Sequence, residues 1–193
     1  LTALKRSKGM AMHETFIFSG FGGQGVMFIG QLLAYAAMDE GLEVTWIPSY
    51  GPEMRGGTAH CTVVVSDRPI GSPIVSRPQI AVVFNIQSFE KYQPLVAEGG
   101  LLVVNSALVE EKATRTDIDV LEVPATTMAY ELGEPRLTNV VLRGATLASR
   151  PVIPVAALRR ALKGHIPAHR RSMLEINYEA LARGETFAGR VQV

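Results

Sequence analysis

Residues 15–25 read Thr-Phe-Ile-Phe-Ser-Gly-Phe-Gly-Gly-Gln-Gly, a short apolar run that ends in a cluster of glycines. Such a run is typical of a buried parallel strand. Apolar residues then follow helical spacing from residue 26 to residue 40, and Gly41 ends the expected helix. The order of strand, glycine loop and helix predicts a βα unit. Within it, Gly20-x-Gly22-x-x-Gly25 matches the fingerprint of dinucleotide-binding folds.

The rest of the chain continues to alternate between strand and helix patterns. Their alternation predicts an α/β fold: a single Rossmann-like, mostly parallel sheet covered by helices, with a helical C-terminal third. The third expected strand follows the second without a helix, so this part departs from a regular βαβ repeat. We expect residues 14–193 to form one domain, and residues 1–13 to be a leader or foreign to the natural chain. The expected strands are 15–19, 44–47, 58–66, 80–84, 101–104 and 120–123, and the expected helices are 26–40, 86–96, 124–131, 137–149, 155–163 and 170–183.

Composition excludes several classes of function. The net charge is +1, which gives no electrostatic argument for binding nucleic acid. The single cysteine, Cys61, can form no internal disulfide and cannot by itself hold an iron–sulfur cluster, so we interpret it as a buried structural thiol. No apolar run approaches the roughly 18 residues needed to span a bilayer, and no signal-peptide pattern is present, so we expect a cytoplasmic protein.

The glycine loop alone leaves its ligand open. A complete dinucleotide fingerprint also needs an acid at the end of the second strand, where it binds the ribose hydroxyls. That strand ends Trp46-Ile47-Pro48-Ser49 without a carboxylate, while Glu40 and Glu43 lie before it. Bound NAD or FAD is therefore disfavoured. A tight turn without a ligand, and a loop that docks an anion or a partner's backbone, both remain open.

A second unusual segment follows the second expected strand. The carboxyl ends of parallel strands meet at one edge of a sheet, so we expect this segment and the glycine loop to converge there. Glu53 and Arg55 form either a local ion pair or, through the arginine, an anion contact. We expect no catalytic residue and no metal site, because His13, His60, His165 and His169 show no ligand spacing. The candidate docking residues are Gly20, Gly22, Gly23, Gln24, Gly25, Ser49, Tyr50, Glu53, Arg55, Gly56 and Gly57.

These two segments together resemble a known family. Gly-Phe-Gly-Gly-Gln-Gly at 20–25 and Pro-Ser-Tyr-Gly-Pro-Glu-Met-Arg-Gly-Gly-Thr-Ala at 48–59 are similar to the gamma subunit of 2-oxoacid:ferredoxin oxidoreductases. The similarity is greater to the 2-oxoglutarate and 2-oxoisovalerate types than to the pyruvate type. It covers most of residues 14–185 and continues through residues 70–73, 105–106, 123–126 and 137–139.

The resemblance implies a complex that oxidatively decarboxylates a 2-oxoacid to an acyl-CoA and passes two electrons to ferredoxin or a similar acceptor. It implies thiamine diphosphate, Mg and iron–sulfur clusters on other subunits or domains, with coenzyme A as a substrate. The partners would be alpha, beta and ferredoxin-like delta subunits, and no nucleic acid or membrane. This chain would supply packing and part of the coenzyme A approach, be inactive when isolated, and then tend to self-associate.

Two alternative functions remain open besides that of a gamma subunit. One is a stand-alone NAD(P)-dependent oxidoreductase, and the other is a regulatory module that binds coenzyme A or a nucleotide. A related question concerns residues 137–149, an amphipathic segment that contains Val140, Val141, Leu142 and Leu147. This segment is either an interface for a partner or part of the chain's own core.

Overall fold

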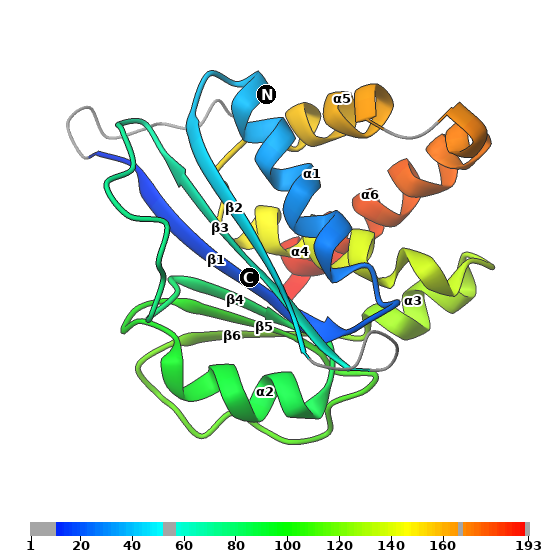
Figure 1. Cartoon of the computed structure of the whole chain (residues 1–193). Helices are drawn as coiled ribbons and strands as arrows, with labels where there is room; N and C mark the ends of the chain where they lie inside the picture. Colours follow the sequence, from blue (N-terminus) through cyan, green and yellow to red (C-terminus); the bar gives the residue numbers. More distant parts are fainter. Residues whose placement is uncertain (1–10, 52–56, 166–167, 192–193) are drawn as a thin grey trace.

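The computed structural model describes residues 11–51, 57–165 and 168–191, which form a six-stranded sheet flanked by helices (Figure 1). The strand order is β2-β3-β1-β4-β5-β6. The pairs β1–β4, β4–β5 and β5–β6 are parallel, whereas β3 runs antiparallel to both of its neighbours. The strands are β1 (His13–Phe21), β2 (Glu43–Tyr50), β3 (Thr58–Ser66), β4 (Ile80–Val83), β5 (Leu101–Asn105) and β6 (Asp119–Val123).

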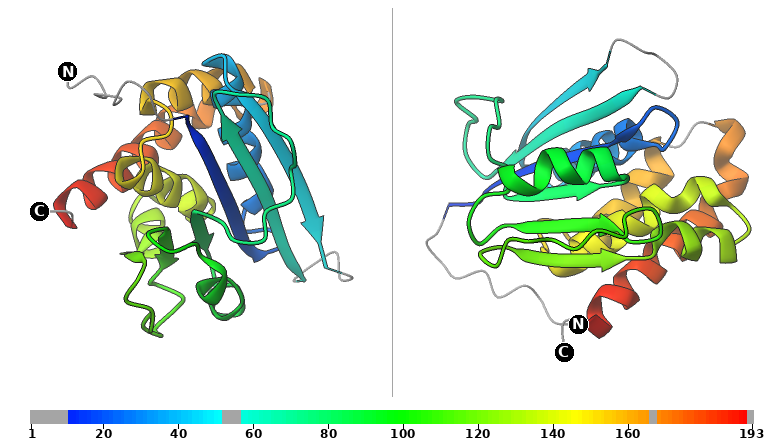
Figure 2. Two further views of the ribbon diagram at one scale, coloured as in Figure 1. Left: turned by 90° about the vertical axis from the view of Figure 1, so that its left-hand side faces the viewer. Right: turned by 90° about the horizontal axis from the view of Figure 1, so that it is seen from below.

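Helices lie on both faces of the sheet, but unequally (Figures 1 and 2). Five of the described helices bury one face, and α2 packs on the other face over β1 and β4. The mostly parallel sheet and the helical end of the chain confirm the predicted fold class. The helices are α1 (Val26–Asp39), α2 (Ile86–Tyr92), α3 (Ala125–Glu131), α4 (Thr138–Ser149), α5 (Val155–His165) and α6 (Leu174–Val191), with short 3₁₀ turns at Gln93–Leu95, Pro135–Leu137 and Ala168–Met173.

The β2–β3 hairpin explains why no helix follows the second strand. Because β3 returns antiparallel between β2 and β1, the direction of β2 still matches that of β1. Pro48 was expected to end the second strand, but it lies inside β2. A proline has no N–H to donate, and an edge strand such as β2 tolerates that loss on its unpaired side. Ser49 and Tyr50 are therefore strand residues rather than loop residues.

Two helix boundaries also differ from the prediction. The helix expected over 86–96 ends at Tyr92 and tightens into a 3₁₀ turn that contains Pro94, which cannot continue the α-helical hydrogen bonding. The helix expected over 170–183 is α6, which begins at Leu174 after a 3₁₀ turn and continues to Val191. Apolar periodicity located both helices but not their ends.

Helix α4 belongs to the chain's own core, so its interpretation as a partner interface is wrong. Val140, Val141, Leu142 and Leu147 are all at most 4% exposed. The helix is buried almost all round, because the sheet covers one side and α1 and α6 cover others. A helix that is apolar on several sides is typical of such a position.

The crossing of α4 and α6 depends on two glycines. A Cβ added to Gly144 would overlap the main-chain oxygen of Leu181, and a Cβ added to Gly184 would overlap the main-chain oxygen of Val141. The two backbones are thus in direct contact, with no space for any side chain between them.

One charged side chain lies inside this helical layer. Arg143 on α4 is 2% exposed, and its Nη1 and Nη2 atoms have no hydrogen-bond partner among the described residues. Its guanidinium carbon lies 5.9 Å from the centre of the Phe18 ring, which provides a weak cation–π contact. Burial lowers the pKa of Arg143 to about 9. A buried charge with so little compensation costs folding free energy.

Candidate functional site

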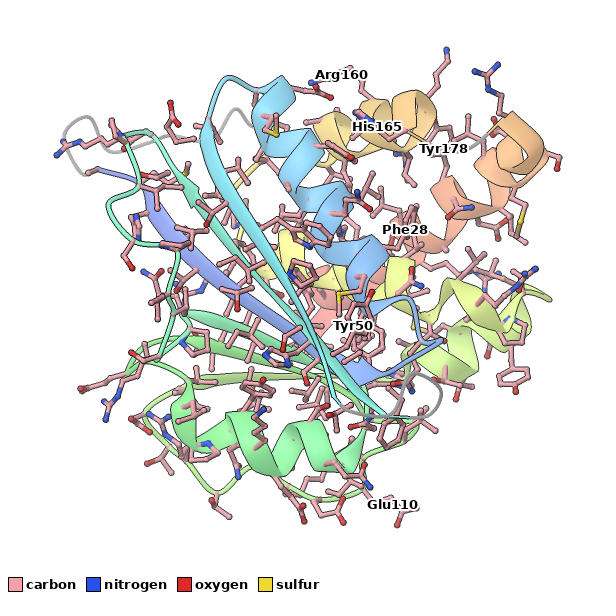
Figure 3. All side chains as sticks on the ribbon, viewed as in Figure 1. Phe28, Tyr50, Glu110, Arg160, His165 and Tyr178 are labelled. Atoms are coloured by element: carbon pink, nitrogen blue, oxygen red, sulfur yellow. The ribbon has the colours of Figure 1, made fainter. Side chains whose placement is uncertain are left out.

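The described ends of the two predicted loops meet at the carboxyl edge of the sheet. Phe21 at the end of β1 is opposite Thr58, and Tyr50 at the end of β2 is opposite Ala59. The Gly22 N–H donates to the Gly57 carbonyl oxygen at 3.0 Å, which ties the glycine loop to the residue that precedes β3. Tyr50, labelled in Figure 3, is 64% exposed beside this contact.

Part of the second loop lies outside the described residues. Glu53, Arg55 and Gly56 belong to residues 52–56, so the choice between an ion pair and an anion contact stays a prediction. On the described side of this gap, the Gly51 N–H donates to the Thr58 carbonyl oxygen at 2.7 Å. The hairpin thus stays paired up to Gly51.

The Gln24 side chain forms a hydrogen bond within the glycine loop. Its side-chain Oε1 accepts the Phe21 N–H at 2.7 Å and a longer hydrogen bond from Asn85 Nδ2 at 3.4 Å. A Cβ added to Gly20 would come within 2.5 Å of the same oxygen. The first glycine of the fingerprint therefore makes room for the chain's own amide. In a dinucleotide site that glycine permits the tight turn.

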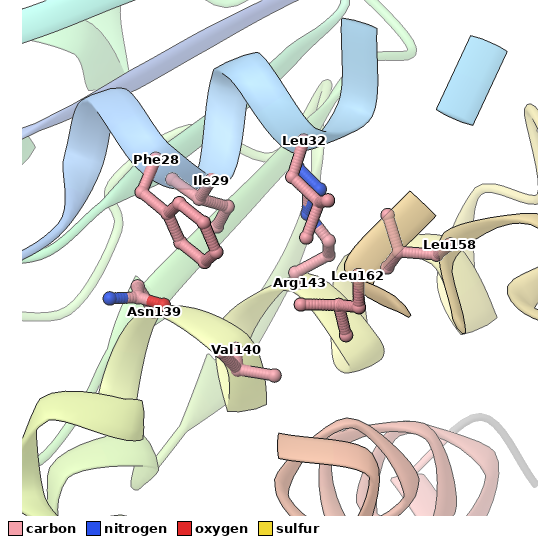
Figure 4. A pocket seen from close by; sticks show the side chains of 8 residues that line it. All are labelled: Phe28, Ile29, Leu32, Asn139, Val140, Arg143, Leu158 and Leu162. Carbon is pink, nitrogen blue, oxygen red and sulfur yellow. The ribbon is translucent and has the colours of Figure 1, made fainter. Parts of the chain in front are cut away.

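Asn139 occupies the corresponding space at the third glycine. Gly25 precedes α1 with φ +78°, and a Cβ added there would overlap the Asn139 side-chain nitrogen. That nitrogen donates to the Gln24 carbonyl oxygen at 3.3 Å and to the Arg136 carbonyl oxygen at 3.1 Å. Figure 4 shows Asn139 on α4 beside Phe28 of α1. Two fingerprint glycines are thus explained by amides of this chain.

Further amides and hydroxyls continue this network along the carboxyl edge. Asn85 caps α2 by accepting the Ser88 N–H at 2.9 Å, and Ser88 shares a 2.9 Å hydrogen bond with Ser19. Asn105 at the end of β5 donates to Thr126 Oγ1 at 2.9 Å. The sequence prediction did not assign Asn85 or Asn139 to the edge. For Asn85 a signal existed, since it directly follows the apolar run 80–84.

The side chains described in this network interact through neutral hydrogen bonds. Gln24, Asn85 and Asn139 carry amides, which neither gain nor lose a proton near neutral pH. A carboxylate adjoins this network at Arg136, whose carbonyl oxygen accepts from Asn139 and whose guanidinium is paired with Glu134 at 2.7 Å. The hydrogen bond from the Arg136 side chain lowers the pKa of Glu134 to about 2 and keeps it ionised. The arrangement suits docking better than proton transfer.

Cys61 lies under α1 and away from this edge. It is fully buried, its Sγ donates to the Val26 carbonyl oxygen at 3.4 Å, and burial raises its pKa to about 12. A protonated, buried thiol is a structural residue, which confirms the prediction for Cys61. Within the described ranges, no group of three or more His, Cys, Asp or Glu side chains could hold a metal ion. Likewise, no described helix has the length and apolar character required to cross a membrane.

Comparison with known proteins agrees with the resemblance seen in the sequence. The family model described as pyruvate ferredoxin/flavodoxin oxidoreductase matches residues 15–187. The solved gamma subunit of a keto/oxoacid ferredoxin oxidoreductase from Geobacter sulfurreducens superposes with a TM-score of 0.78 and 28% identity, covering 91% of this chain and 98% of that one.

Two curated relatives carry the same region in chains of different length. The 2-oxoglutarate synthase subunit KorC of Methanocaldococcus jannaschii is 33% identical over 90% of this chain and 92% of its own. The ketoisovalerate oxidoreductase subunit VorA of Methanothermobacter marburgensis is 40% identical over 67% of this chain but only 27% of its own. The chain thus spans about a quarter of one relative and nearly all of the other. It belongs to the pyruvate ferredoxin/flavodoxin oxidoreductase family.

Proposed function

We propose that the chain is the gamma part of a 2-oxoacid:ferredoxin oxidoreductase complex in the cytoplasm. The complex would oxidatively decarboxylate a 2-oxoacid to an acyl-CoA and pass two electrons to ferredoxin or a similar acceptor. The observation that carries this proposal is the family match over residues 15–187, together with a relative of nearly the same length that is a subunit of 2-oxoglutarate synthase. These relatives give no support to a stand-alone NAD(P)-dependent enzyme.

Within that complex, we assign the two loops at the carboxyl edge to docking. Their convergence through the Gly22–Gly57 hydrogen bond supports this assignment, as does the exposed ring of Tyr50. The internal hydrogen bonds of Gln24 argue against a bound pyrophosphate. The docking residues would be Gly20, Gly22, Gly23, Gln24, Gly25, Ser49, Tyr50, Glu53, Arg55, Gly56 and Gly57, which would contact a partner subunit and border the approach of coenzyme A.

The cofactors of the complex would then belong to other subunits or domains. An iron–sulfur cluster needs several accessible thiolates, whereas Cys61 is the only cysteine and is buried and protonated. Thiamine diphosphate and Mg would lie on the alpha and beta parts, and the clusters on these and a ferredoxin-like delta part. The contribution of this chain is packing and positioning.

Reconstitution tests this proposal directly. The partner polypeptides encoded by the same organism would be assembled with and without this chain, and the rate of viologen reduction measured with a 2-oxoacid and coenzyme A. We expect the rate to depend on the chain. Tyr50→Ala and Arg55→Ala should weaken subunit association or raise the KM for coenzyme A, while the matched control Ile74→Ala, on an exposed loop elsewhere, should not.

Two results would contradict the proposal at different levels. Full activity without this chain would remove the assigned function. Unchanged association, coenzyme A affinity and acyl-transfer rate in both Tyr50→Ala and Arg55→Ala would leave the function but remove the docking role of the loops.

A further inference from the structure

We infer that Asn139, on α4, is a positioning residue that sets the placement of the glycine loop against Gly57, the described end of the second docking loop. Only the docking role of the loops rests on the proposed function, because the inference concerns how the loops are held. Asn139 is 7% exposed and reaches the glycine loop from a helix 115 positions later in the sequence. In the part of the chain that the structure describes, no contact is recorded between Asn139 and the second loop.

The junction between the glycine loop and α1 lacks a cap of its own. Gly25 is the N-cap residue of α1, and it has no side chain that could bind the first free N–H groups. The Asn139 amide instead holds the loop from the outside, through the Gln24 carbonyl oxygen. The absence of a Cβ at Gly25 is what allows this amide to approach.

The hydrogen-bond inventory of Asn139 indicates that its donors matter more than its oxygen. Its nitrogen donates to two carbonyl oxygens, of Gln24 and Arg136, whereas its Oδ1 is buried without a partner among the described residues. An unsatisfied buried acceptor opposes folding. The presence of an asparagine at this position is therefore explained by the two hydrogen bonds that its side-chain nitrogen donates to main-chain carbonyl groups.

Gln24 connects Asn139 to Gly57, the described end of the second loop, through the glycine loop. Its main chain is held by α4, while its side chain is held by Phe21 and by Asn85 at the start of α2. Gly22 lies between these two attachment points and donates to Gly57. Releasing Asn139 should therefore loosen the Gly22–Gly57 hydrogen bond without disturbing the strands.

Amide hydrogen exchange on the full chain, followed by NMR, measures this effect. The wild type would be compared with Asn139→Ala, with the isosteric Asn139→Asp and with the control Leu147→Ala, which removes a buried side chain at the other end of α4. We expect the Gly22 amide to exchange about tenfold faster or more in both Asn139 variants, relative to the Phe18 amide of β1. The Asp variant should be faster than the Ala variant, because its carboxylate cannot donate and faces two carbonyl oxygens.

A purely structural role predicts a different pattern. If Asn139 only stabilised the fold, all three variants would speed the exchange of Gly22 and Phe18 by the same factor, and the inference would be overturned. Unchanged Gly22 exchange in Asn139→Asp would overturn it as well. Failure of the wild-type chain to restore activity in the reconstituted complex would remove the proposed function but would leave this exchange result intact.

Discussion

Glycines at the carboxyl edge and glycines at the crossing of α4 and α6 make room for different kinds of neighbour. Gly25 leaves space for the Asn139 amide, the end of a side chain. Gly184 leaves space for the main-chain oxygen of Val141. A side chain can turn aside when crowded, whereas a backbone oxygen moves only if its helix moves. Crowding at the edge can therefore be relieved by movement of a side chain, whereas crowding at the crossing cannot.

The two regions also differ in how they treat buried polar groups. At the edge, the side chains of Gln24 and Asn85 form hydrogen bonds with one another and with the main chain, and the uncharged Oδ1 of Asn139 lacks a partner among the described residues. In the helical layer, the guanidinium of Arg143 has no hydrogen-bond partner among the described residues. The layer thus combines tight packing with an uncompensated charge. The difference suggests that stability can be gained in the layer, while the edge is built for specific geometry.

The largest effect is expected from Gly184→Ala at the helix crossing. The added methyl group meets backbone, so overpacking should cost about 3 kcal/mol and lower the Tm by about 6–12 °C in a domain of this size. The control is Gly189→Ala on the same helix, where nothing lies within 4 Å of an added Cβ. That variant should gain up to about 1 kcal/mol from helix propensity. Equal stabilities in thermal denaturation would contradict the assigned backbone contact.

The next largest effect is a gain in folding stability. Arg143→Met replaces a buried charge with an apolar side chain of similar length, and we expect it to stabilise the chain by about 2 kcal/mol in urea denaturation. The exposed control Arg190→Met should change stability by less than about 0.5 kcal/mol. A loss of stability in Arg143→Met would show that the guanidinium has a partner beyond the described residues.

A smaller, coupled effect is expected at the carboxyl edge. Gly25→Ala introduces strain, because φ is +78°, and it also crowds Asn139. In the Asn139→Ala background only the strain should remain, so the substitution should cost about 1 kcal/mol less there. A double-mutant cycle measures this difference. Strict additivity would mean that the edge does not depend on this contact.

The last effect concerns the pH dependence of stability and Cys61, which lies on β3 beneath α1. Its pKa is about 12 in the folded chain, against about 9 when exposed. The stabilising contribution of the protonated thiol is complete below pH 9 and is lost progressively as pH rises from 9 to 12. By pH 10 we expect a loss of about 1.4 kcal/mol relative to pH 7, which Cys61→Ala should not show. Equal pH slopes in both proteins would contradict a raised pKa.

Local sequence signals predicted much of the fold. The apolar run before Gly20, the helix closed by Gly41 and the absence of a helix between the second and third strands all follow from periodicity and turn residues close in the chain. The antiparallel pairing of those two strands was not predicted. Pro48 could not be placed, because whether a strand lies at a sheet edge depends on the order of all strands. Contacts between residues far apart in the sequence could not be predicted either. The main example is the hydrogen bond from Asn139 to Gln24, which lies 115 positions earlier.

The candidate site was predictable in its location but not in its internal chemistry. The sequence placed both loops at one edge because parallel strands share that edge. It could not show that Gln24 and Asn139 fill the spaces beside Gly20 and Gly25, since this depends on side-chain positions across the fold. In the sequence, the missing ribose acid after β2 and the polar amide of Gln24 in the glycine loop argued against a dinucleotide.

The central claim is that side chains of this protein, and not a dinucleotide, fill the space at the glycine loop. Titration with NADH tests this claim most directly, when it is followed by fluorescence and by the amide chemical shifts of Gly22 and Gly25. Gln24 Oε1 already accepts the Phe21 N–H, and Asn139 already occupies the space beside Gly25. We expect no saturable binding up to about 1 mM, a concentration that corresponds to about 4 kcal/mol of affinity. Micromolar binding with shifts at Gly22 and Gly25 would contradict a loop that is internally satisfied.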